Sequence, residues 1–329
     1  MRPSYSPWPI MLKSHRLNAD LWTLLTTVVL VSLVATAGCR PEKTSARSSQ
    51  TEAQTLRAER RGNQIRITVE GELFTVYTFA EDQKYPYFYP VNGPRSGESV
   101  TTESSEPWPH HHSLFFACDR VNGGNYWQEG LERGQIVAQE THIHKAEGPS
   151  VVFSQTSLWQ RPGAPSPFRD VRRIRISAPS PDLRVIDFDI TLIPLVDVRI
   201  EKTNHSLFSA RMAPELSVEN GGTLINAHGQ TGEEGTWGEK APWCDYWGTR
   251  NGITEGLAIL VHPDNRWFPP PWFTRDYGFF SPTPMNWLEG GHLDLPKGEK
   301  LHLRYRVIVH GGTTEEAAIA KLYKAYIER

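Results

Sequence analysis

Several features that assign a sequence to a common function class are missing here. The 329 residues carry a formal net charge of −2, and they contain no block of basic residues. Nucleic-acid binding depends on such a block, so this class is excluded. The chain also has no G-x-S-x-G elbow, no H-E-x-x-H motif and no phosphate-binding loop. These absences exclude serine hydrolases, zincins and nucleotide-dependent enzymes.

Cysteine is also scarce. The sequence contains three cysteines, Cys39, Cys118 and Cys244, and it shows no thiolate or thioether cluster of the copper type. Cys118 and Cys244 can pair in an oxidising compartment, but two positions do not establish a bond.

Long apolar runs are limited to one, Leu21–Ala37, close to the N-terminus. Basic residues precede it and Gly38-Cys39 follow it, which is the order of a secretory signal. The small residues before Cys39 resemble a bacterial lipobox, and this resemblance implies that Cys39 is lipidated. We therefore expect residues 1–39 to be a signal peptide. The protein would be exported and anchored to a membrane, in the periplasm or at the cell surface; an uncleaved anchor is the alternative.

The next segment, residues 40–61, is polar and has almost nothing to bury. It is predicted to be a disordered tether. The remaining residues 62–329 are long enough for a sizeable core, and all-β domains of this length are common.

Strand-like alternation dominates this domain. Gln64–Val69 and Leu73–Phe79 predict a hairpin, and Leu183–Leu192 and Lys300–Val309 alternate as half-buried antiparallel strands do. The aromatic segment Lys84–Val91 contains two prolines and fits an edge strand or an extended lining segment better than a central strand. Further strands are expected at residues 113–118, 135–145, 151–159 and 171–177.

The C-terminus has a different pattern. Thr313 and Glu316 have the spacing of a capping box. Apolar residues then recur at helical spacing from Ile319 to Tyr326. One amphipathic helix is predicted to close the domain by packing on a sheet.

Three adjacent histidines, His110–His112, stand at the start of a predicted strand, and Trp127 follows an Asn-Gly-Gly turn. Imidazoles bind metals and move protons near neutral pH, and tryptophan rings stack on sugar rings or bases. Successive strand residues point to opposite faces, so His111 is expected to point away from His110 and His112. At least one of the three is then expected to be structural.

Two irregular regions, residues 229–246 and 262–278, combine aromatic and charged side chains. Loops of this length are usually functional, although surface loops that cover a core are the alternative. Three consecutive prolines stiffen the second region and reduce the entropy cost of presenting its side chains to a ligand.

A metal site is a weaker hypothesis. It rests on His110–His112 and on His142 and His144, which share a strand face and supply only two ligands. Scattered histidines on exposed strands are the alternative, so no metal ligand is assigned and the cofactor is left open.

These motifs together resemble a family. The stretches PHHHSLFFA, DRVNGGNYW, WGEKAPWCDYWG and HPDNRWFPPPWFTRDYG occur in this order, and they are similar to the bacterial PmoA-like family, also called methane oxygenase PmoA. That name would imply a metal-dependent oxygenase. The methane-oxidising membrane enzyme needs several apolar spans of about 20 residues, however, and this chain has one.

A second resemblance concerns the fold. The segment VRIEKTNHSLFSA is similar to T-x-x-N-H-S-Y-F in the galactose mutarotase-like supersandwich, with Leu207 replacing the aromatic residue. This likeness implies an all-β antiparallel β-sandwich with one C-terminal α-helix. It also implies that histidines and a carboxylate perform acid–base chemistry on a sugar.

We therefore predict a membrane-tethered lipoprotein that acts on a carbohydrate or another small polar ligand. The alternatives are a non-catalytic glycan-binding lipoprotein and the oxygenase. Burying an unpaired charged group in a core is costly, whereas a sugar site needs both charged groups and aromatic rings. The predicted catalytic residues are His111, His112, Asp245 and His262, and the predicted substrate-binding residues are Trp127, Trp243, Arg266, Arg275 and Tyr277. His111, His112, Trp243, Asp245, His262, Arg275 and Tyr277 are expected to converge on one pocket, unless Arg275 and Asp245 pair with each other.

Overall fold

A computed structural model describes residues 53–128 and 130–328 of the chain. The predicted signal peptide, its lipidation site Cys39 and most of the predicted tether lie outside these residues. Residues 56–61 do not belong to a tether, because they form strand β1 (Leu56–Arg61) with Leu56 and Ala58 buried. The predicted boundary between tether and domain at Arg61 is therefore wrong. Although the segment is mostly polar, its two apolar residues alternate as in a strand, and it pairs with the neighbouring strand β2 (Gln64–Val69).

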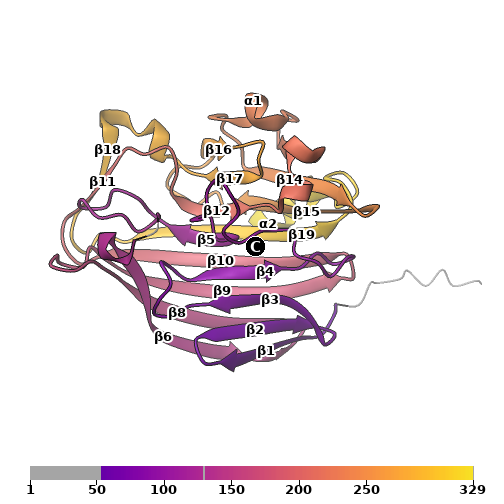
Figure 1. The fold of residues 1–329 in the computed structure, drawn as a ribbon, viewed down its shortest axis with the longest axis horizontal. Helices are drawn as coiled ribbons and strands as arrows, with labels where there is room; N and C mark the ends of the chain where they lie inside the picture. Colours follow the sequence, from indigo (N-terminus) through magenta and orange to yellow (C-terminus); the bar gives the residue numbers. More distant parts are fainter. Residues whose placement is uncertain (1–52, 129, 329) are drawn as a thin grey trace, which may run out of the picture. The chain divides into compact units, whose positions relative to one another are not determined.

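The predicted fold class is confirmed: the domain is an antiparallel β-sandwich (Figure 1). The first sheet has nine strands in the order β16-β17-β12-β5-β4-β3-β2-β1-β7. Its remaining strands are β3 (Glu72–Thr78), β4 (Tyr87–Val91), β5 (Leu114–Ala117), β7 (Glu147–Gly148), β12 (Leu207–Arg211), β16 (Trp272–Thr274) and β17 (Phe279–Pro282).

The second sheet has eight strands in the order β13-β14-β15-β19-β10-β9-β8-β6. Its strands are β6 (Gln135–Lys145), β8 (Ser150–Gln160), β9 (Phe168–Ser180), β10 (Leu183–Pro194), β13 (Thr223–Asn226), β14 (Trp243–Arg250), β15 (Ile253–Val261) and β19 (Leu301–Gly311). A separate ribbon pairs β11 (Val198–Glu201) with β18 (His292–Leu295).

Helical turns occupy little of the described chain. The α-helices are α1 (Gly232–Thr236) and α2 (Ile319–Ile327). The single-turn 3₁₀ helices are η1 (Leu131–Arg133), η2 (Pro214–Leu216), η3 (Val218–Asn220), η4 (Met285–Trp287) and η5 (Glu289–Gly291). Within the described residues, none of these helices is long and apolar enough to cross a membrane.

The core lies between the two sheets and is rich in aromatic rings. Phe208 of β12 stacks on Tyr305 of β19 with ring centroids 4.8 Å apart, and Tyr77 of β3 lies 5.3 Å from Phe153 of β8. Ring pairs at such distances add to the free energy of apolar burial. Because side chains alternate along each strand, every strand of the sandwich also has an outer face.

The C-terminal helix covers the outer face of the second sheet, as expected. Ile319 and Tyr326 of α2 are buried against Val185, Leu260 and Ile308 of that sheet. The predicted capping box is present: the Thr313 amide donates to Glu316 Oε2 at 2.9 Å, and the Glu316 amide donates to Thr313 Oγ1 at 3.3 Å. The box closes a turn before the helix, which begins at Ile319 after Ala318 adopts a left-handed backbone.

The segment Lys84–Val91 differs from its prediction. Its strand β4 is not at an edge but lies between β3 and β5. Proline is accommodated because the register with β3 shifts between Thr75 and Tyr77, so that Tyr89 and Pro90 face a single residue of the partner strand. A β-bulge of this kind tolerates a residue without an amide hydrogen.

Candidate functional site

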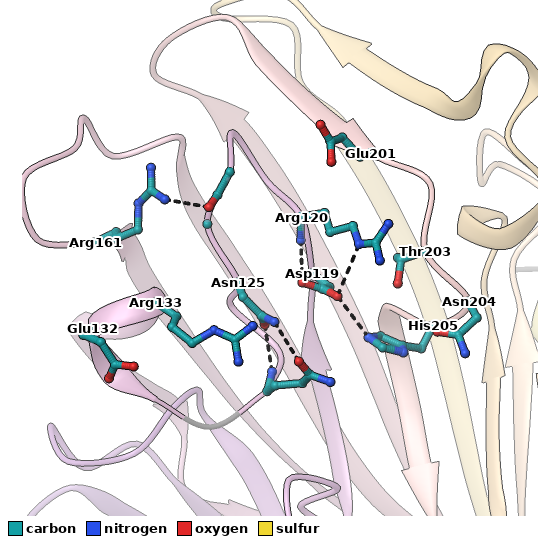
Figure 2. A pocket seen from close by; sticks show the side chains of 13 residues that line it. Asp119, Arg120, Asn125, Glu132, Arg133, Arg161, Glu201, Thr203, Asn204 and His205 are labelled. Carbon is teal, nitrogen blue, oxygen red and sulfur yellow. Dashed lines mark hydrogen bonds and ion pairs between the residues drawn. The ribbon is translucent and has the colours of Figure 1, made fainter.

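A polar hollow with a volume of about 650 Å³ lies where the loop after β5 meets the segment between β11 and β12. In Figure 2, Asp119 and His205 from these two segments face each other, and Arg133 from the turn that contains η1 is directed toward Asn125. It is lined by Asp119, Arg120, Gly123, Gly124, Asn125, Gln128, Glu132, Arg133, Arg161, Glu201, Thr203, Asn204 and His205. Cationic, anionic and amide groups are interspersed, so the hollow is suited to a ligand with many hydroxyl groups.

An acid–base pair stands at the wall of this hollow. His205 Nε2 lies 3.4 Å from Asp119 Oδ2, and the two side chains are only 14% and 10% exposed. Burial raises the pKa of Asp119, but the hydrogen bond and charge of His205, together with the backbone amide and charge of Arg120, outweigh it, and the pKa lies below its ordinary value. The carboxylate therefore stays ionised near neutral pH and can hold and stabilise a protonated imidazole.

The His205 ring rests on a tryptophan. The rings of His205 and Trp127 are stacked with centroids 4.7 Å apart and an interplanar angle of 23°. Trp127 is fully buried, and Asn125 Oδ1 accepts a hydrogen bond of 2.9 Å from its amide. The imidazole is thus fixed by a carboxylate at its edge and by an indole on its face.

The backbone next to His205 is strained. Ser206 and Leu207 have φ angles of 115° and 74°. A left-handed conformation at a residue as bulky as leucine costs on the order of 1–3 kcal/mol, and such strain is concentrated at functional sites. The Ser206 hydroxyl accepts a hydrogen bond of 2.9 Å from the Asp119 amide, which ties the two segments of the pair together.

Arginines surround the pair at the rim. Arg161 donates to the carbonyl of Gly123 at 2.6 Å, and Arg120 donates to the carbonyl of Lys202 at 2.9 Å. Both therefore hold loops. Arg133 has no ion pair with any other described residue, and its guanidinium is directed toward Asn125 in Figure 2. It is the arginine best placed to bind a ligand in the hollow.

A second polar group is buried behind Trp127, on the outer face of the first sheet. His111 packs on Phe279 at 4.3 Å between ring centroids, and the Arg211 guanidinium lies 4.2 Å from the centre of the Tyr277 ring. Burial, followed by the charges of His110 and Arg211, lowers the pKa of His111 to about 2. His111 is therefore neutral at every physiological pH.

Some of the predicted site residues do come together. His111, Trp127 and Tyr277 belong to this group, with ring centroids 6.3 Å apart for His111 and Trp127 and 6.5 Å apart for His111 and Tyr277. His112 points elsewhere, and its ring stacks on Tyr87 at 5.0 Å. The alternation predicted for the three histidines is wrong, because they precede β5 and do not lie in a strand; the rings of His110 and His111 are only 4.5 Å apart.

The prediction that all seven side chains converge on one pocket is wrong. Asp245 and Trp243 of β14 point to the outer face of the second sheet, because Cys244 and Tyr246 between and beside them fill the core. Asp245 is fully buried there and accepts hydrogen bonds from His310 at 2.9 Å and Thr314 at 2.7 Å.

The remaining predicted residues also lie away from the hollow. His262 packs on Tyr326 of α2 at 5.2 Å, and burial and the charge of Arg304 lower its pKa. Arg266 is exposed beside Glu299. Arg275 pairs with Glu233 at 2.9 Å and not with Asp245, so that alternative is also wrong. Arg266 and Arg275 found partners in other segments of the chain, which spacing alone does not show.

None of the thirteen residues that line the hollow was in the predicted site. The omissions that matter most for its chemistry and for the second group are Asp119, His205 and Arg211. Signals for two of them were present, because Asp119 begins the DRVNGGNYW stretch and His205 lies in the T-x-x-N-H-S segment. Arg211 carried no signal beyond the polar end of a strand.

Among the described residues, no group of three or more histidines, cysteines or acidic residues has the arrangement of a metal site. His142 and His144 are both exposed on β6. Cys118 and Cys244 are buried free thiols and do not pair.

The chain is similar to several solved structures at low sequence identity and low TM-score. A galactose 1-epimerase from Lactobacillus acidophilus is 10% identical, with 80% of this chain and 100% of that chain covered and a TM-score of 0.36. An alpha-galactosidase from Lactobacillus brevis is 9% identical over 80% of this chain and 39% of that one, with a TM-score of 0.35. An aldose epimerase homologue from C. elegans is 8% identical over 79% and 99%, with a TM-score of 0.30.

Sequence comparison identifies a family. No curated protein matches the chain, and the resemblance to the PmoA-like family is not supported. The model of a family of unknown function, DUF6807, matches residues 64–324, which is nearly the whole described domain. The chain therefore belongs to the DUF6807 family.

Proposed function

We propose that this protein binds a carbohydrate or sugar derivative in the polar hollow and that His205 and Asp119 transfer a proton to or from it. The observation that carries the proposal is the buried Asp119–His205 pair, 3.4 Å apart, at the wall of the hollow. Elsewhere in the described chain the histidine–carboxylate pairs either are fully buried, as in Asp245–His310, or have an exposed carboxylate.

The lining supports a sugar as ligand. Asn125, Gln128 and Asn204 offer amide donors and acceptors, and Arg133 and Glu201 offer charged ones. A hollow of about 650 Å³ has the size of ordinary small-molecule sites. The alternating charges favour hydroxyl groups over a ligand of a single strong charge.

The chemistry follows from the pair. In this proposal the imidazole hydrogen is on His205 Nε2, 3.4 Å from the ionised Asp119 carboxylate, and Nδ1 is the basic atom of the imidazole. When a sugar hydroxyl or C–H group loses its proton to Nδ1, the resulting imidazolium is stabilised by Asp119. Return of the proton to a different oxygen or carbon face would complete an isomerisation or assist bond cleavage.

A panel of mono- and oligosaccharides tests the proposal. Ligands are found by thermal shift and their conversion is followed by NMR, with the wild type compared with Asp119→Asn and His205→Gln. We expect both variants to bind the ligand within about tenfold of the wild type and to convert it about 100-fold more slowly, a typical effect of losing one general acid or base.

The outcome also separates the two main alternatives. A sugar that is bound but never altered would identify a glycan-binding protein and remove the catalytic part of the proposal. If no carbohydrate of the panel binds, the proposal is wrong as a whole. Thr156→Ala, on a strand of the second sheet, serves as the control for handling and folding.

We also propose that Cys39 is lipidated and tethers the domain to a membrane, on the basis of the apolar run and the residues that precede Cys39. Cys39→Ser is expected to move the protein from the membrane fraction to the soluble fraction of cells that export it. A variant that stays as firmly in the membrane fraction as the wild type would contradict the lipoprotein proposal.

A further inference from the structure

Arg211 is a buried cation without a counterion. Its side chain lies on the outer face of β12, because Phe208 and Ala210 of the same strand point into the core. The residue is 2% exposed, and its Nε and Nη1 atoms have no hydrogen-bond partner. No carboxylate of the described chain forms an ion pair with it, and the face of Tyr277 is its main contact. Burying such a charge unpaired is strongly unfavourable.

Other unsatisfied polar atoms gather around this arginine. Ten buried side-chain nitrogen or oxygen atoms of the described residues lack a hydrogen-bond partner, and five of them belong to this face of the first sheet. They are His111 Nδ1, Trp127 Nε1, Ser209 Oγ, Arg211 Nε and Arg211 Nη1. His205 Nε2 is not counted with them, because it lies 3.4 Å from Asp119 Oδ2 in the polar hollow. Buried polar groups are nearly always satisfied, so a cluster of exceptions indicates a missing partner.

The chemistry of that partner follows from the donors. Arg211 and Trp127 can only donate, and Ser209 can donate as well. The cluster therefore favours an acceptor-rich group. Arg211 is the one cation of the cluster, since His111 is neutral between the arginine and Phe279. A single positive charge among aromatic rings matches a group with one negative charge better than a dianionic phosphate.

We propose that Arg211, Ser209 and His111 form a binding site for a carboxylate group, beneath the partly exposed ring of Tyr277. The carboxylate would accept charge-assisted hydrogen bonds from the guanidinium and a further one from the Ser209 hydroxyl. Its source is either an acidic sugar or a small free carboxylic acid. The site is distinct from the polar hollow and does not depend on the function proposed for the hollow.

Isothermal titration calorimetry with purified protein tests the site. The probes are galacturonate and glucuronate, their neutral parents galactose and glucose, acetate, and inorganic phosphate. We expect at least one uronate to bind at least tenfold more tightly than its neutral parent. Acetate that competes with the uronates and binds as tightly as they do would identify a small carboxylic acid as the natural ligand. Phosphate that binds as tightly as any carboxylate would overturn the choice of ligand class.

Variants of the arginine decide between a binding and a structural role. Arg211→Met is expected to weaken carboxylate binding at least tenfold, as the loss of a charge-assisted hydrogen bond does. Without ligand it should melt at the wild-type temperature or above it, because an unpaired buried charge is removed. Ser209→Ala removes a single hydrogen-bond donor with little change in volume and should weaken carboxylate binding several-fold. If Arg211→Met does not fold, this variant decides between a binding site and a structural role.

The matched control is Arg275→Gln, because Arg275 also lies against an aromatic ring but is paired with Glu233. It should change carboxylate binding by less than about twofold, in line with the small contribution of exposed pairs. If the wild type binds no carboxylate, or if Arg211→Met and Ser209→Ala both bind carboxylates as tightly as the wild type does, Arg211 is structural. Neutral sugars that bind while carboxylates do not would leave the proposed function intact and end this inference.

Discussion

Replacing Arg172 by leucine is expected to lower the free energy of unfolding by about 3–5 kcal/mol, because the change leaves a buried carboxylate without its counterion. Arg172 and Asp170 of β9 are both fully buried and 3.0 Å apart. The charge of Asp170 and its hydrogen bond overcome the effect of burial and raise the pKa of Arg172 above its ordinary value. Urea denaturation followed by circular dichroism measures the loss.

The network around this pair explains why a single replacement is costly. Asp170 also accepts a hydrogen bond of 2.8 Å from the Trp159 indole. The Tyr77 hydroxyl, 3.4 Å from Arg172 Nη1, donates to Gln155 at 2.7 Å. Removal of one charge therefore disturbs several buried groups on three strands.

Two further variants of β9 check this prediction. The double variant Asp170→Leu with Arg172→Leu should recover much of the lost stability, because apolar residues often replace a buried ion pair at little cost. Arg173→Gln is the control, since Arg173 is exposed on the opposite face of the same strand, and it should change stability by no more than about 0.5 kcal/mol. A loss below about 1 kcal/mol for Arg172→Leu would contradict the importance of the pair.

Replacing Asp245 by asparagine is expected to destabilise the domain by about 1.5–3 kcal/mol near pH 6, the range for a hydrogen bond to a charged group. His310 and Asp245 are both fully buried and 2.9 Å apart. Burial lowers the pKa of His310, but the charge and hydrogen bond of Asp245 outweigh it, so the pKa lies above its ordinary value.

Because the pKa of His310 is raised, the stability that Asp245→Asn loses depends on pH, and it becomes smaller as the pH rises. The folded state binds a proton more tightly than the unfolded chain, in which the histidine pKa is about 6.5. The stabilisation is therefore complete below about pH 6.5 and declines as the pH rises through the pKa of the folded state, by up to about 1.4 kcal/mol per pH unit. Unfolding of the wild type and of Asp245→Asn between pH 6 and pH 9 measures this difference.

The other histidines with shifted pKa values do not affect the comparison of the wild type with Asp245→Asn. The pKa values of His111 and His262 are lowered, so their effect on stability appears only below about pH 6.5, where the unfolded chain takes up protons. We expect the gap between the wild type and Asp245→Asn to narrow as the pH rises. A gap that is constant over this range would show that His310 is neutral in the folded protein.

The sequence alone determined several strands and the closing helix. The alternation of Gln64–Val69 and Leu183–Leu192 places β2 and β10 almost residue by residue, because period two is a local property of a half-buried strand. The capping box of Thr313 and Glu316, which is also a local feature, formed as expected.

Only the tertiary structure decided which faces are covered and which distant residues meet. The C-terminal segment covers Asp245 and turns a predicted catalytic carboxylate into the buried partner of His310. Asp119 and His205 meet because β5 and β12 are neighbours in the first sheet despite the long chain between them. Alternation assigns a side chain to a face, but the strand order of the sheets and the segments that pack on them determine whether that face is core, covered or open. This order depends on contacts between distant parts of the chain, which a periodic pattern does not contain.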